Sequence, residues 1–220
     1  MIGQTGSGKT LIDEFQTIMN KGIKYVVRHR ETSMFVGAAV LIGVILLIFL
    51  STGREKQNPE ADMLHTQSMG LVAMGRFQEA ENTLLDLTSK YSNTRAGKIG
   101  YYYLGAIYYN TGRFDQALTS FEKFLSMQKK DYLLVPSARF GAACSAEGLK
   151  DYESALGYYE KVAKDKESPF YFMAMLAYGR VNGLLGDTEK AKEILKELLE
   201  QDPPPEIATD AKFYIGYFND

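Results

Sequence analysis

The sequence predicts an all-α protein, namely a stack of helical hairpins preceded by one N-terminal transmembrane helix. Three observations predict this fold. A turn signature that ends in alanine recurs at Ala80, Ala117, Ala155 and Ala191, which is a spacing of 36 to 38 residues. Apolar residues follow each alanine at helical spacing. An uncharged run, Met34 to Leu50, precedes the repeats. Because a fixed period of this length is typical of helical solenoids, we expect a binding protein and no enzyme.

The N-terminal tail, residues 1–33, opens with Gly3 to Thr10, which matches the phosphate-binding loop of nucleotide-binding enzymes. Such a loop works at the end of a buried strand and together with an aspartate that holds magnesium. The tail shows neither of these patterns. We therefore expect a flexible Gly/Ser/Thr segment without a nucleotide or any other cofactor, and a P-loop nucleotide-binding protein stays as an alternative.

Apolar residues recur at helical spacing from Leu11 to Val26, so this part of the tail is expected to form an amphipathic helix. The helix leads into basic residues next to the predicted span. We expect it to lie on the cytoplasmic membrane surface, with its apolar face in the bilayer and its lysines on anionic lipid. A docking element for a membrane partner is the alternative interpretation.

Residues 34–52 are the predicted transmembrane helix, and residues 53–60 are expected to be a linker. With its flanking serine and threonine residues the run reaches about the minimum length for crossing a bilayer as a helix. A cleaved signal peptide is the other interpretation, but the preceding segment is long for one and Ser51 to Gly53 is a poor cleavage site. Lysine and arginine are more frequent before the run than directly after it. This bias predicts a cytoplasmic N-terminus and extracytoplasmic repeats.

Residues 61–220 are expected to form about four helix pairs and one capping helix, Ile207 to Phe218. In the second pair, Gly105 removes a side chain where the two helices must approach closely. The equivalent small residues of the other pairs are Ser68, Ala143 and Gly179. The second helix of each pair carries an apolar stripe at positions i, i+4 and i+7. These stripes are Ala80-Leu84-Leu87, Ala117-Phe121-Phe124, Ala155-Tyr159-Val162 and Ala191-Leu195-Leu198.

Charge and chemistry-bearing residues exclude several functions. The part after the predicted span has 20 basic and 24 acidic residues, a net charge of −4, which argues against a nucleic-acid-binding surface. Cys144 is the only cysteine, so no intrachain disulfide can form. His65 and Asp62 could supply two metal ligands, but two ligands make an incomplete site. We therefore expect no metal and no catalytic residues.

These patterns resemble the tetratricopeptide repeat family. The second copy carries the family signature most fully, and the first and third copies are degenerate. Its signature residues are Tyr101, Leu104, Gly105, Tyr108, Ala117 and Phe121. The resemblance implies a groove lined by a second set of positions on the first helix of each pair. Carried onto this sequence, the candidate groove residues are His65, Met69, Ile99, Tyr102, Ala106, Tyr109, Asn110, Phe140, Cys144, Met173, Leu176 and Arg180.

The implied groove is apolar, aromatic and methionine-lined, which suits an apolar peptide or helix of a partner protein. His65 and Met69 replace polar residues that the family uses to clamp the acidic C-terminus of a chaperone, so we expect no such clamp. If Tyr102 and Tyr109 line the groove, replacing both by alanine should weaken partner binding and leave thermal melting almost unchanged.

The order of tail, span and repeats is similar to the ancillary subunit of the bacterial SecYEG translocon. That resemblance implies a single-pass protein of the bacterial inner membrane, with translocon subunits, periplasmic chaperones or emerging polypeptides as partners. Two alternatives stay open. One is a general scaffold for cell-wall or outer-membrane assembly, and the other is an organelle import receptor with its repeats in the cytosol.

Overall fold

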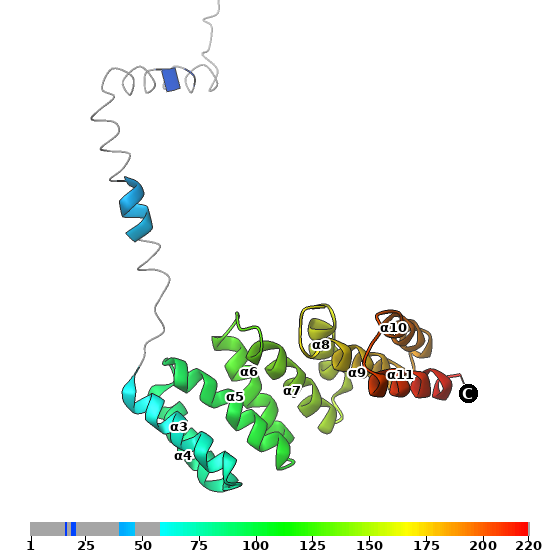
Figure 1. Ribbon diagram of the computed structural model, residues 1–220, viewed down its shortest axis with the longest axis horizontal. Helices are drawn as coiled ribbons and strands as arrows, with labels where there is room; N and C mark the ends of the chain where they lie inside the picture. The colour runs from blue at the N-terminus through cyan, green and yellow to red at the C-terminus, as the bar shows by residue number, and fades with distance from the viewer. Residues whose placement is uncertain (1–15, 17–18, 21–39, 47–57, 220) are drawn as a thin grey trace, which may run out of the picture. The chain divides into compact units, whose positions relative to one another are not determined.

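The computed structural model describes residues 16, 19–20, 40–46 and 58–219 (Figure 1). The chain divides into two compact units, Met1–Arg54 and Glu55–Asp220. We describe each unit by itself.

In the first unit, residues 40–46 are helical, and six of these seven residues are exposed. Among the described residues, no helix has both the length and the apolar character needed to cross a bilayer. The phosphate-loop-like segment, most of the expected amphipathic helix and the rest of the 34–52 run lie outside the described residues.

The second unit is a solenoid of α-helices, which confirms the expected repeat architecture (Figure 1). Its helices are α3 (Pro59–Ala73), α4 (Phe77–Tyr91), α5 (Arg95–Asn110), α6 (Phe114–Met127), α7 (Leu134–Gly148), α8 (Tyr152–Ala163), α9 (Tyr171–Leu184), α10 (Thr188–Glu200) and α11 (Pro205–Tyr217). We call α3, α5, α7, α9 and α11 the first helices, and α4, α6, α8 and α10 the second helices. The solenoid begins at Pro59, within the stretch expected as a linker.

Several helices begin where a side chain can satisfy free backbone N–H groups. The Asn58 carboxamide oxygen accepts hydrogen bonds from the N–H groups of Glu60 and Ala61 at the start of α3. Thr94, Asp151 and Asp187 cap α5, α8 and α10 in the same way. Local sequence therefore explains where these helices start.

The turn inside each repeat requires a left-handed backbone. Gly75, Gly112 and Gly186 have φ values of 71°, 74° and 91°, which glycine adopts without steric cost. The third repeat has Lys150 at this place, with φ of 62°. The recurring signature thus marks a left-handed turn. The third copy adopts the same turn although it has lysine, not glycine, at this position.

The predicted apolar stripes form the core, since every one of their residues is at most 3% exposed. The small residues of the first helices allow this packing. A Cβ atom on Gly105 would lie 2.8 Å from the Phe121 ring, and one on Gly179 would lie 2.7 Å from the Leu195 side chain. The predicted apolar stripes and the close approach predicted at the small residues of the first helices are both confirmed.

The last helix, α11, closes the solenoid as the expected capping helix, although it begins before Ile207, at Pro205. It packs on α9 and α10. Ala211 and Phe218 are buried there, and Phe218 occupies the space that a side chain at Gly183 would need. Pro203 follows the end of α10, where the chain turns.

Candidate peptide-binding groove

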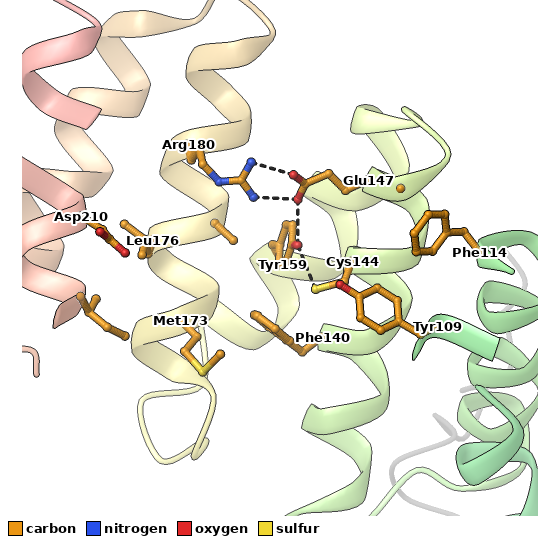
Figure 2. A pocket seen from close by; sticks show the side chains of 13 residues that line it. Tyr109, Phe114, Phe140, Cys144, Glu147, Tyr159, Met173, Leu176, Arg180 and Asp210 are labelled. Atoms are coloured by element: carbon orange, nitrogen blue, oxygen red, sulfur yellow. Dashed lines mark hydrogen bonds and ion pairs between the residues drawn. The ribbon is translucent and has the colours of Figure 1, made fainter. Parts of the chain in front are cut away.

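A cavity of about 630 Å³ lies along the first helices in the C-terminal half of the solenoid, between α7 and α9 (Figure 2). The neighbouring first helices α3 and α5, α5 and α7, and α9 and α11 pack against each other, but α7 and α9 approach less closely. The cavity includes this wider gap and extends to residues of α5 and α11. Its lining residues are Tyr109, Phe114, Phe140, Cys144, Glu147, Gly148, Tyr159, Met173, Leu176, Ala177, Arg180, Ile207 and Asp210.

Apolar and aromatic side chains make up most of the cavity wall. Tyr109 and Met173 are 38% and 46% exposed, so this wall is open to solvent. The Phe140 ring is held from two sides, by Tyr159 at 5.5 Å and by Phe170 at 5.9 Å between ring centroids. Preformed apolar surface of this kind suits the side chains of a partner protein.

A chain of polar contacts runs between the two walls (Figure 2). The Arg180 guanidinium donates two hydrogen bonds to the Glu147 carboxylate, at 2.6 and 2.8 Å. The Tyr159 hydroxyl donates to the same carboxylate at 3.0 Å, and it lies 3.3 Å from the Cys144 sulfur. Glu147 and Arg180 are each 22% exposed. This ion pair joins α7 to α9, which approach each other less closely than the other neighbouring first helices.

The charges of this network are stable near neutral pH. Burial alone would raise the pKa of Glu147, but the Arg180 hydrogen bonds and charge outweigh it, so the pKa lies below its usual value. The hydrogen bond to Glu147 raises the pKa of Arg180. Burial raises the pKa of both Cys144 and Tyr159. The Cys144 thiol therefore stays protonated and lacks the character of a nucleophile.

The structure brings half of the sequence-predicted groove residues into this cavity. Those that line it are Tyr109, Phe140, Cys144, Met173, Leu176 and Arg180. The others lie on α3 and α5, outside the cavity lining. They are His65, Met69, Ile99, Tyr102, Ala106 and Asn110.

Tyr102 is half-buried and packs against α6 and α7. Its ring lies 6.0 Å from Phe121 and 5.8 Å from Phe124, centroid to centroid. Its hydroxyl and that of Ser137 are 2.8 Å apart and hydrogen-bonded. Replacing Tyr102 by alanine would remove contacts among α5, α6 and α7. These contacts lead us to expect that the variant with both Tyr102 and Tyr109 replaced by alanine melts below the wild type, contrary to the expectation from the sequence.

His65 likewise packs inward, with its ring 5.6 Å from that of Tyr103. Burial lowers the pKa of His65. Its Nε2 atom is buried, and no residue in the described part of the chain hydrogen-bonds to it. Within that same part, no group of three or more histidine, cysteine and acidic side chains could hold a metal ion.

Three polar lining residues were missed by the sequence analysis, namely Glu147, Tyr159 and Asp210. For two of them, the position within the repeat could have identified the residue from the sequence. Glu147 follows Ala143 by four residues, just as Tyr109 follows Gly105. Tyr159 places a hydroxyl at the stripe position that Leu84, Phe121 and Leu195 fill in the other repeats.

Family models of the tetratricopeptide repeat match residues 99–131 and 140–216. A curated relative, the uncharacterized protein ycf37 of Guillardia theta, is 26% identical over 132 residues, which cover 60% of this chain and 73% of that protein.

Solved structures show the same fold. A tetratricopeptide repeat protein from Parabacteroides merdae aligns with a TM-score of 0.64 at 20% identity, over 74% of this chain and 61% of that one. YrrB, described as a repeat protein with an unusual peptide-binding site, aligns with a TM-score of 0.56 at 19% identity, over 70% of this chain and 74% of its own. At these identities the likeness concerns the fold alone.

Proposed function

We propose, since this chain carries tetratricopeptide repeats, that it is a membrane-anchored interaction scaffold whose α7–α9 cavity binds an apolar segment of a partner protein. Repeats of this type typically serve as interaction scaffolds rather than as enzymes. The observation that carries the proposal is the solvent-open apolar cavity between α7 and α9.

The size and chemistry of the cavity suit one or a few large side chains of a peptide. Its volume of about 630 Å³ is within the range of sites that enclose small organic groups. Burying one leucine- or phenylalanine-sized side chain contributes about 1.5–3 kcal/mol. Met173 is unbranched and adapts its shape to different partners. YrrB, with the same fold, has a peptide-binding site, which is compatible with this use of the fold.

For the cellular setting, we infer that residues 34–52 anchor the protein in the bacterial inner membrane with its N-terminus in the cytoplasm. The repeats then face the extracytoplasmic side. There they contact translocon subunits, chaperones or emerging polypeptides. The support is the uncharged run, the basic residues before it and the order of tail, run and repeats.

The cavity is tested with Met173→Asp, which places a charge in its apolar wall. We expect the amount of partner protein recovered with the variant to fall by about tenfold or more. The bound ligand would bury the new charge without a partner, which is costly. Met63→Asp is the matched control, since Met63 is 60% exposed on α3, away from the cavity. Circular dichroism and thermal melting should be unchanged in both variants. Equal recovery of the same partners by both variants would contradict the proposal.

The cellular role is tested by co-purification of the full-length protein from mildly solubilised membranes, with mass spectrometry of what is retained. We expect channel subunits with the wild type and their loss with Met173→Asp. A stable complex of cell-wall or outer-membrane assembly proteins would replace the translocon role by that of an envelope scaffold. The cavity proposal would stand in that case.

A further inference from the structure

We propose that the groove continues onto α11, where Asp210, Phe213 and Tyr217 select a basic residue next to the apolar segment of the ligand. This inference rests on the proposed function. It adds the chemistry of the partner, namely a peptide segment that is apolar at one point and carries arginine or lysine nearby.

The register of α11 places these three residues on the groove side. Met173, Leu176 and Arg180 line the cavity from α9. The residues 37 positions later are Asp210, Phe213 and Tyr217. The buried side of α11 follows the same offset. Ala174 and Val181 are buried in α9, and Ala211 and Phe218, also 37 positions later, are buried in α11. The α11 helix therefore continues the series of first helices, with its groove positions uncovered.

Phe213 and Tyr217 form an exposed aromatic platform. They are 63% and 60% exposed, and their rings stack at 6.3 Å with an angle of 19° between their planes. Each ring also contacts a more deeply buried neighbour, Tyr214 at 5.3 Å or Phe218 at 5.4 Å between centroids. The exposed faces of the two rings offer a stacking surface to a ligand.

The charge beside the platform is negative and uncompensated. Asp210 lies on the α11 side of the cavity (Figure 2). Within the described part of the chain, no hydrogen bond or ion pair to its carboxylate is found. The other two charged lining residues, Glu147 and Arg180, neutralise each other. A carboxylate next to exposed aromatic faces favours a guanidinium or ammonium group, through charge pairing and cation–π attraction.

The first test is selection of short random peptides, displayed on phage, by the immobilised full-length protein in mild detergent. We expect the wild type to enrich apolar residues together with arginine or lysine. Asp210→Asn should keep the apolar preference and lose the basic one. Apolar peptides without basic enrichment, or unchanged enrichment with Asp210→Asn, would overturn this inference and leave the proposed function standing. The absence of any apolar consensus would remove both.

The second test measures affinity by fluorescence anisotropy, with one selected peptide and its analogue in which citrulline replaces the basic residue. We expect wild-type protein to prefer the basic peptide by about threefold to tenfold at low salt. The ratio of the two affinities should fall to near one in Asp210→Asn and be reduced in Tyr217→Ala. Glu153→Gln on α8 and Tyr132→Ala, which alter exposed side chains elsewhere, should keep it. A preference that survives both groove variants would place the basic contact elsewhere and refute the assignment.

Discussion

Tyr102 on α5 and Leu176 on α9 occupy the same register position, three residues before the small residue of their helices. In the N-terminal half, α3, α5 and α7 pack closely, and the half-buried Tyr102 packs against Phe121 of α6. In the C-terminal half, α7 and α9 are further apart, and Leu176 lines a cavity. Both side chains are half-buried, but the same sequence position packs between closely spaced helices in one half and lines a cavity in the other.

The two halves also differ in how ion pairs hold them together. Arg113 pairs with Glu81 across the first two repeats, between residues at the starts of α6 and α4. Arg180 pairs with Glu147 across the open gap between α7 and α9. The first pair supplements a region that is already packed. The second links two helices that line the cavity and approach less closely than the other neighbouring first helices, which is why we expect its loss to matter more for the cavity.

Two tyrosine variants test most directly whether a packed position and a cavity position differ. Tyr102→Ala should lower the free energy of unfolding by about 2–3 kcal/mol, because it leaves a cavity against Phe121 and Phe124. Tyr109→Ala, on the exposed cavity wall, should lower it by less than about 1 kcal/mol and weaken ligand binding instead. Urea unfolding measures both. Equal destabilisation by the two changes would mean that the packed position and the cavity-lining position of α5 do not differ.

A smaller effect is expected from the Glu147–Arg180 pair. A double-mutant cycle with Glu147→Gln and Arg180→Ala should give a coupling energy of about 1–2 kcal/mol, since both side chains are largely shielded from solvent. The control is the Asp86–Lys90 pair, which is 42% and 58% exposed and should give no measurable coupling. Equal coupling in the two cycles would show that the pair across the gap has no special role.

The smallest expected effect is the pH dependence of the stability that the Glu147–Arg180 pair contributes. The folded state lowers the pKa of Glu147 below its ordinary value of 4.5, so the contribution of this group to stability is present above that pH. It should be lost as the pH falls through the lower, folded-state value. The stability difference between wild type and Glu147→Gln should therefore be largest near neutral pH and shrink on acidification. A difference that does not change between pH 7 and about pH 3 would contradict this assignment.

Much of the fold could be predicted because its determinants are local. The stripe Ala117, Phe121 and Phe124, and the glycine that faces it, Gly105, belong to one repeat and are close in sequence. Their helical spacing therefore predicted the buried face and its partner directly. The turn glycines and the capping helix could be predicted from the same repeat spacing.

The sequence by itself determined the repeat, its core and the positions from which a groove can be built. Only the tertiary structure decided which of these positions are open, because that depends on how far apart successive first helices lie. Tyr102, predicted as a groove residue, accordingly lies outside the cavity and is half-buried between closely packed helices. The Glu147–Arg180 pair joins residues 33 positions apart, and no local pattern predicts that they meet. The cavity is lined by residues from Tyr109 to Asp210, so it exists only once several repeats have packed together.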